Sequence, residues 1–285
     1  MSTTKKIGLI LGPLLFFFIH FYFEGDGLSD QGRDILAITV WIGLWWVLEV
    51  LPISVTALLP IILFPLLDTI TLGETTASYG HKYVFLYMGG FMLAMAIEKW
   101  GLHKRIALYI IKAIGTNMYT IVLGFMVATA FLSMWISNTA TTVMVLPMAV
   151  SIIKQLEDNP NSIHSVNKSF SKLLMLSIAY AASIGGMATL IGTPPNLVFA
   201  GFVQKSYGVD ISFWQWMKFG LPVATLLLIL SWYYLTRIAY PQKEKKFPGG
   251  NEEINRLIKE LGPMKVEEKR VLFVFVLTAF CWITR

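Results

Sequence analysis

From Met118 to Ile153 the chain contains no charged residue, and this stretch most constrains the fold. It is too long for a strand of an outer-membrane barrel and lacks the period-two alternation of such strands. Only 14% of the 285 residues are charged and 55% are apolar, whereas soluble domains carry about 25% charged residues. The sequence therefore predicts an all-α, polytopic membrane protein.

Further apolar stretches predict additional membrane spans, at about 7–23, 35–50, 52–67, 83–96, 173–203 and 213–240, with a last one beginning at 271. A polar segment at 241–265 predicts a linker and a short amphipathic helix along the cytoplasmic surface. The predicted organisation is N-terminal scaffold-like spans at 1–115, a helical hairpin at 116–158, a broken helix at 170–207, a long membrane helix at 211–240, the linker and amphipathic helix at 241–265, and the start of a further span at 266–285.

The basic residues predict how the chain is oriented. The net charge of +6 could suggest a nucleic-acid partner, but Lys and Arg lie mainly in short segments between apolar stretches, as membrane orientation requires. Most of them fall on the cytoplasmic side if the N-terminus is cytoplasmic and the stretch 118–153 enters and leaves on the same side. Two short full crossings would satisfy the same count, but arms of roughly 17 to 19 residues are near the minimum for spanning. We therefore expect a re-entrant hairpin, and no nucleic-acid partner.

The predicted hairpin carries a polar tip, Ser137–Thr142, and Pro147 is expected to interrupt the stretch again. Non-helical backbone survives at membrane depth only inside protein or beside water. Free carbonyls with hydroxyl and amide oxygens suit an alkali cation, whereas N–H groups at a helix N-terminus suit an anion. Ser133, one turn before Ser137, can add another oxygen. The alternative is that these hydroxyls bond back to their helix or pack against neighbours; the whole cluster beside a break favours binding.

A second interruption, "SIGGMATLIGTPPNLVFAG", begins at Ser183. Its glycines and paired prolines cannot sustain a regular helix, and two such breaks in one chain point to a shared transporter site. A kinked helix packed through its glycines is the alternative. No nucleophile–base set or metal-ligand spacing appears, which disfavours an enzyme or a transition-metal site. The single cysteine, Cys281, is expected to be a buried apolar residue.

Four motifs together resemble the divalent anion/sodium symporter family: "EVLPISVTALLPIILFPLL", "YVFLYMGGFMLAMAIEKWGLHKRIAL", "SNTATTVMVLP" and "IGTPPNLVFAG". The likeness covers nearly the whole chain, in order and at this spacing. It implies the first half of an inverted-repeat, elevator-type transporter that works as a homodimer, with a re-entrant hairpin and a broken helix. The second half of that family, with another Ser-Asn-Thr hairpin, is not in this sequence, so we expect either a fragment or a truncated gene.

The resemblance also implies the residues of the site. The sodium ligands would be Ser133, Ser137 and Asn138, with backbone carbonyls around Gly186 and Gly192. The substrate contacts would be Asn138, Thr139, Thr193, Pro194 and Asn196. The coupling ion would be Na⁺, with no other cofactor.

The functional hypothesis is sodium-coupled symport of divalent anions across the cell (inner) membrane, with C4-dicarboxylates such as succinate, malate and fumarate preferred. A sodium-independent anion exchanger of the same fold, or citrate or sulfate as substrate, is the alternative. An ion channel is a weaker alternative function.

Overall fold

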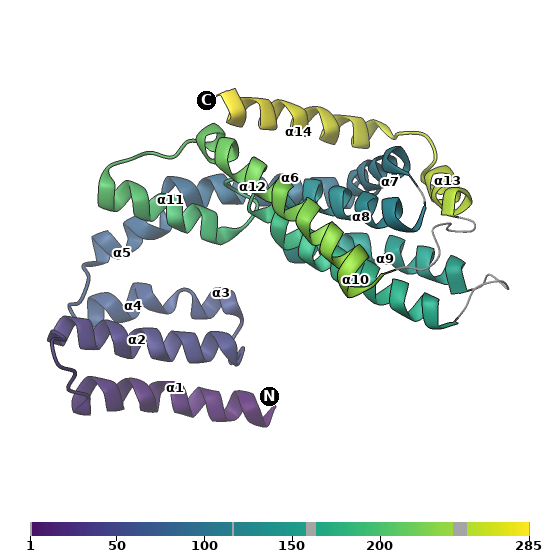
Figure 1. Ribbon diagram of the computed structural model, residues 1–285. Helices are drawn as coiled ribbons and strands as arrows, with labels where there is room; N and C mark the ends of the chain where they lie inside the picture. Colours follow the sequence, from purple (N-terminus) through teal and green to yellow (C-terminus); the bar gives the residue numbers. More distant parts are fainter. Residues whose placement is uncertain (1, 116, 158–163, 242–249, 285) are drawn as a thin grey trace. The chain divides into compact units, whose positions relative to one another are not determined.

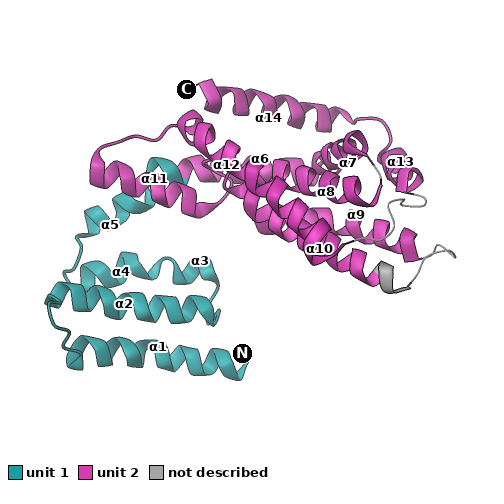
Figure 2. Cartoon of the chain, viewed as in Figure 1, with its two compact units in different colours: residues 1–84 teal, residues 85–285 magenta. Residues whose placement is uncertain are grey.

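The computed structural model describes residues 2–115, 117–157, 164–241 and 250–284, and every regular element in these ranges is a helix (Figure 1). The predicted all-helical fold class is confirmed. The chain divides into two compact units, residues 1–84 and residues 85–285 (Figure 2). This boundary differs from the one predicted at 115, because most of α6 and all of α7 group with α8 in the second unit. Of the predicted linker, residues 242–249 lie outside the described residues.

The first unit contains five helices among its described residues: α1 (Thr3–Tyr22), α2 (Asp30–Val47), α3 (Ile53–Thr56), α4 (Leu59–Leu66) and α5 (Leu72–Tyr79). Helix α1 packs along α2, and α2 packs against α4. Its core consists of Phe16, Ala37, Ile38 and Leu63. The close approach of α1 and α2 needs a small residue at Gly12, where a Cβ would lie 2.5 Å from Trp45 Nε1.

The single span predicted at 52–67 is instead two short helices, α3 and α4. Pro60 explains the interruption, because its ring would collide with the carbonyl of Thr56 in a continuous helix and it has no N–H to donate. Helix α5 was not predicted. The signal was present in the sequence, since Thr71 and Glu74 form a capping box at its start.

The second unit contains the remaining helices. They are α6 (Lys82–Lys99), which begins at the boundary, α7 (Leu102–Ile114), α8 (Met118–Ser133), α9 (Asn138–Glu157), α10 (His164–Gly186), α11 (Pro194–Tyr207), α12 (Phe213–Tyr233) with a π-helical continuation η1 (Tyr234–Ala239), α13 (Gly250–Leu261) and α14 (Val266–Thr284).

Helix α8 lies at the centre of this unit, packed against α7 and α10, while α9 packs against α10. The side chains of Ile121 and Phe125 in α8 are fully buried, as is Phe170 in α10. A Cβ at Gly124 would lie 3.0 Å from the Cα of Ile111, so this glycine lets α7 approach α8 closely. The centre of the unit is thus the pair of segments that the sequence singled out for their polar breaks.

Two further expectations are wrong. Pro147 lies inside α9 and does not interrupt it, as occurs where other groups near a membrane helix satisfy the freed carbonyl. Cys281 is exposed on α14.

Among the described residues, three helices are long and apolar enough to cross a membrane: Thr3–Tyr22, Asn138–Glu157 and Phe213–Ala239. Helix α9 is one of them, whereas α8 has only 16 residues. Length alone does not make the pair α8 and α9 re-entrant, so that feature stays a prediction that rests on the distribution of charge.

Candidate functional site

Two breaks in the helices of the second unit lie side by side. One separates α8 from α9 at residues 134–137, and the other separates α10 from α11 at residues 187–193. The hydroxyl of Thr189 in the second break donates to the carbonyl of Met134 in the first. The hydroxyl of Ser133, at the end of α8, lies 2.7 Å from the carbonyl oxygen of Ala182 in α10. The polar tip and the glycine-proline segment therefore share one location.

In the second break, two prolines end the helical hydrogen bonding and a side chain supplies the missing donors. Helix α11 starts at Pro194, since Pro194 and Pro195 have no N–H to continue a helix from before. The side-chain amide of Asn196 donates to the carbonyl of Gly186 (2.9 Å) and to that of Thr189 (2.8 Å). Buried carbonyls left by a broken helix need such partners.

Three glycines let the broken segments approach one another. A Cβ at Gly185 would collide with the backbone of Ala130 in α8, lying 2.5 Å from its Cα. A Cβ at Gly186 would collide with the side-chain amide of Asn138, and one at Gly192 would lie 2.5 Å from the Gly186 oxygen. Because the atoms around Gly185 and Gly192 are backbone, no side-chain movement could make room there.

The predicted sodium ligands Ser133 and Asn138 are in direct contact. The Ser133 hydroxyl, which is fully buried, lies 2.7 Å from Asn138 Oδ1 as well as 2.7 Å from the Ala182 oxygen. A hydroxyl has one proton and can donate to only one of these two acceptors. With the Asn138 amide in this orientation, three oxygen atoms meet around a single proton.

The other predicted sodium ligands lie close by. Gly186 and Gly192 are buried and contact one another, and Gly186 also faces the Asn138 side chain. Ser137 is half-buried and caps α9, since its hydroxyl accepts from the N–H of Ala140 at 3.3 Å.

The predicted substrate residues differ in exposure. Thr139 and Pro194 are exposed, Thr193 and Asn138 are half-buried, and Asn196 is only 7% exposed. Both amide hydrogen bonds of Asn196 go to the chain itself, so this side chain positions the break.

The two helix N-termini at the site are not equivalent as anion sites. Helix α9 begins with the N–H groups of Asn138 and Thr139, ahead of its first intrahelical hydrogen bond, which Thr141 donates to Ser137. Helix α11 begins with two prolines, and the next N–H, that of Asn196, already donates to Thr193 at 3.2 Å. An anion would therefore find more backbone donors at α9.

Sequence reasoning missed two contributors to the site. Thr189 is fully buried and joins the two breaks, and the carbonyl of Ala182 faces Ser133. Thr189 carried a signal, because it is a hydroxyl residue between the glycine pair and the proline pair. The Ala182 carbonyl carried none, since any residue in α10 has one.

Comparison with known proteins places the chain in a family. Residues 3–285 match the family model described as the sodium:sulfate symporter transmembrane region. The chain belongs to this family. It is therefore an integral membrane protein of a transporter family, and the resemblance drawn from the four motifs is confirmed.

The chain is also similar to curated proteins named as sodium-dependent dicarboxylate transporters. The chain is 48% identical over 284 residues to the sodium-dependent dicarboxylate transporter SdcS of Staphylococcus saprophyticus, covering 99% of this chain and 54% of that protein. It is 46% identical over 286 residues to SdcS of Staphylococcus aureus strain MRSA252, covering 100% of this chain and 55% of that protein. The chain thus spans about half the length of the curated relatives it matches.

Proposed function

We propose that the chain forms half of a sodium-coupled symporter for divalent anions, with C4-dicarboxylates such as succinate, malate and fumarate as preferred substrates. The names of the relatives support both the ion and the substrate class. The observation that carries the proposal is the cluster of neutral oxygens where the two breaks meet, formed by the Ser133 hydroxyl, the Asn138 side chain and the Ala182 carbonyl.

An alkali cation resolves this arrangement. With a cation present, the Ser133 hydroxyl can donate to Ala182 and turn a lone pair toward the ion, while Asn138 Oδ1 accepts the ion directly. Ser137 and the carbonyls of Gly186 and Gly192 are the further ligands we propose. All these donors are neutral oxygens, which suit a hard, singly charged cation better than a transition metal.

The substrate carboxylate would bind on the more exposed side of the same cluster. We propose that Asn138 and Thr139 at the N-terminus of α9 donate to it, and that Thr193, Pro194 and Asn196 shape the opposite wall. No acidic or basic residue is among these groups, so bound sodium would supply the charge that offsets the anion. In this mechanism sodium binds first and organises the two breaks, and the dianion follows.

We further propose a multi-pass arrangement in the cell membrane with a cytoplasmic N-terminus, in which α8 and α9 form a re-entrant hairpin. The charge distribution supports it. Within this arrangement the predicted segments 116–158, 170–207 and 211–240 are the hairpin, the broken helix and a membrane helix. The complete protein would act as a homodimer with elevator-like movement.

Sodium binding can be tested on the 285-residue chain itself. Purified protein in detergent should unfold at a higher temperature in sodium chloride than in choline chloride, because an ion that binds only the folded state stabilises that state. Ser133→Ala should abolish this difference. The matched control is Thr225→Ala, since the Thr225 hydroxyl donates within α12 to the carbonyl of Leu221, away from the two breaks. An equal response of all three proteins would contradict the sodium site.

Transport is tested with a full-length form that contains this chain. Uptake of radiolabelled succinate should require sodium and should be lost in Asn138→Ala, with membrane insertion retained. Succinate exchange in preloaded proteoliposomes without sodium would instead support the exchanger. Single-channel currents would support a channel.

A further inference from the structure

A groove separate from the two helix breaks lies on the second unit between the end of α7 and one face of α13. This groove has a volume of about 620 Å³. Five of its six lining residues carry a polar or charged group, and their aliphatic parts add apolar surface: Lys112 from α7, and Glu252, Asn255, Arg256, Ile258 and Lys259 from α13. The polar residues from α13 follow a helical i, i+3, i+4, i+7 spacing, so they lie on one face of that helix. None of these residues contributes to the candidate transport site.

The groove carries two ammonium groups that the described part of the chain does not neutralise. Arg256 is neutralised within α13, because it bonds twice to Glu253 (2.6 and 2.7 Å) and also pairs with Glu260. Lys112 and Lys259 have no ion pair within the described part of the chain. Only Glu252 opposes these two ammonium groups in the groove. The groove is therefore complementary to an anion.

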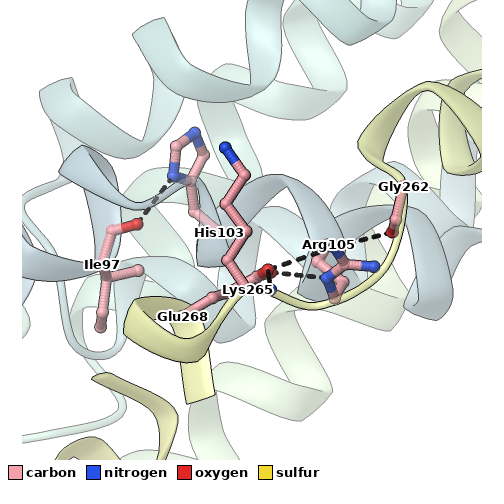
Figure 3. A network of polar contacts seen from close by, with 6 residues as sticks. All are labelled: Ile97, His103, Arg105, Gly262, Lys265 and Glu268. Carbon is pink, nitrogen blue, oxygen red and sulfur yellow. Dashed lines mark hydrogen bonds and ion pairs between the residues drawn. The ribbon is translucent and has the colours of Figure 1, made fainter. Parts of the chain in front are cut away.

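Arg105 links α7, which forms one wall of the groove, to the segment that directly follows α13. Arg105 of α7 donates to Glu268 through Nε at 2.5 Å and through Nη2 at 3.1 Å, and its Nη2 also donates to the carbonyl of Gly262 at 3.2 Å (Figure 3). Gly262 directly follows α13, and the Ile254 side chain of α13 is fully buried. The hydrogen bond that Arg105 donates to Glu268 raises the pKa of Arg105, so this guanidinium remains charged. The groove is thus formed before any ligand arrives.

The neighbours of α13 in the sequence limit how far the groove can lie from the membrane surface. In the sequence, α13 follows the membrane-length helix Phe213–Ala239. Only residues 262–265 connect α13 to α14. A connection of that length spans less than about 20 Å. The apolar part of α14 begins at Val271, after the charged residues Lys269 and Arg270. In a membrane-inserted chain, this short connection would keep α13 near the surface at which the apolar part of α14 begins.

We propose that this groove binds the headgroup of an anionic phospholipid. Lys112 and Lys259 would contact the phosphate, and Ile258 would contact the less polar glycerol region. A lipid is favoured over a soluble phosphate because the groove would lie near the surface where headgroup phosphates are concentrated and has an apolar side chain in its lining. The inference requires that the chain is in a membrane, and does not require that it transports.

The test is a lipid titration of the purified chain in detergent, followed by native mass spectrometry. The probes are dioleoyl phosphatidylglycerol, dioleoyl phosphatidylcholine and inorganic phosphate. Phosphatidylglycerol should bind and the other two should not compete with it. The double variant Lys112→Gln/Lys259→Gln should bind phosphatidylglycerol roughly thirty-fold more weakly, which corresponds to about 2 kcal/mol for two lysines near a membrane surface.

The matched control is Lys104→Gln/Lys269→Gln, which removes the same charge from exposed positions outside the groove. It should bind phosphatidylglycerol within about two-fold of the unmodified chain. An equal loss in both double variants would overturn the proposal, because it would show a general effect of charge. Competition by inorganic phosphate would overturn the lipid as the ligand.

A third variant gives a result of opposite sign. Glu252→Gln removes the one carboxylate that opposes the two lysines in the groove, so phosphatidylglycerol should bind several-fold more tightly. Weaker binding in this variant would contradict the proposed headgroup position. All substituted side chains are exposed, and unchanged circular dichroism would show that each variant folds.

Discussion

Replacing three helical glycines by alanine separates the packing of the breaks from the chemistry of the site. Gly185, Gly186 and Gly89 all lie in helices of the second unit. They differ in what an added methyl group would meet: the backbone of Ala130 for Gly185, the side chain of Asn138 for Gly186, and nothing within 4 Å for Gly89. The same chemical change therefore probes a rigid contact, a movable contact and open space.

The expected magnitudes follow from these contacts. At Gly185 the backbone of α8 must move, so we expect a loss of about 3 kcal/mol, the upper end for overpacking. At Gly186 the methyl group would lie 3.0 Å from Asn138 Cγ and Nδ2, and the side chain can swing away from Ser133. That costs about 1 kcal/mol for the hydrogen bond and about 1 kcal/mol for strain. Gly89→Ala should stabilise by about 0.5–1 kcal/mol, since alanine is the better helix former.

Thermal unfolding in detergent, with sodium or choline chloride, measures both effects. The unfolding temperature should fall most for Gly185→Ala, less for Gly186→Ala, and not at all for Gly89→Ala. Gly186→Ala should also lose the stabilisation by sodium, because its methyl group displaces a proposed ligand, whereas Gly89→Ala should keep it. If Gly186→Ala kept both its unfolding temperature and its sodium response, the assigned role of Asn138 would be refuted.

Three further substitutions test other parts of the structure. Asn196→Ala leaves two buried carbonyls without donors, so it should destabilise the protein by about 2 kcal/mol, measured by thermal unfolding. The isosteric Asn196→Asp should not restore the stability, because a carboxylate cannot donate to these carbonyls. Arg105→Met leaves Glu268 buried without its partner and should cost about 3 kcal/mol, while the double variant Arg105→Met/Glu268→Leu should recover most of it; equal stability of the two would contradict this account. Burial lowers the pKa of His103 below its ordinary value of 6.5, so the unfolded state binds a proton at higher pH than the folded state. Stability should be full above about pH 6.5 and decline below it, and His103→Gln should flatten that decline in a pH series of unfolding temperatures.

The main breaks of the fold could be predicted from sequence because backbone chemistry determines them locally. Pro194 and Pro195 cannot donate hydrogen bonds, so a helix must end before them and a new one can start there. Polar residues at Ser137 and Asn138 within an uncharged stretch likewise mark a break, since the membrane interior permits them only where protein satisfies them.

What could not be predicted depends on tertiary contacts. Helix α7 is short and basic at its start, so hydropathy alone gave it no span, and its burial against α8 requires Gly124. Pro147 was expected to break α9, but the helix continues through it. The orientation of Asn196 toward its own chain, and the meeting of Ser133 with Ala182, involve residues that only the folded chain brings together.

The gradient of burial across the candidate site bears on the order of binding that we propose. Ser133 is fully buried, Asn138 is half-buried and Thr139 is exposed. In the proposed mechanism a cation must therefore reach the innermost oxygens, whereas an anion can bind at the outer N–H and hydroxyl groups. A dianion that arrived first would block the way to Ser133 and would meet the Asn138 oxygen without any compensating charge. If sodium arrives first, it holds Asn138 Oδ1 inward, and the amide NH₂ of the same side chain is then turned toward the anion. One asparagine can thus couple the two ligands, because it offers its oxygen to one and its nitrogen to the other.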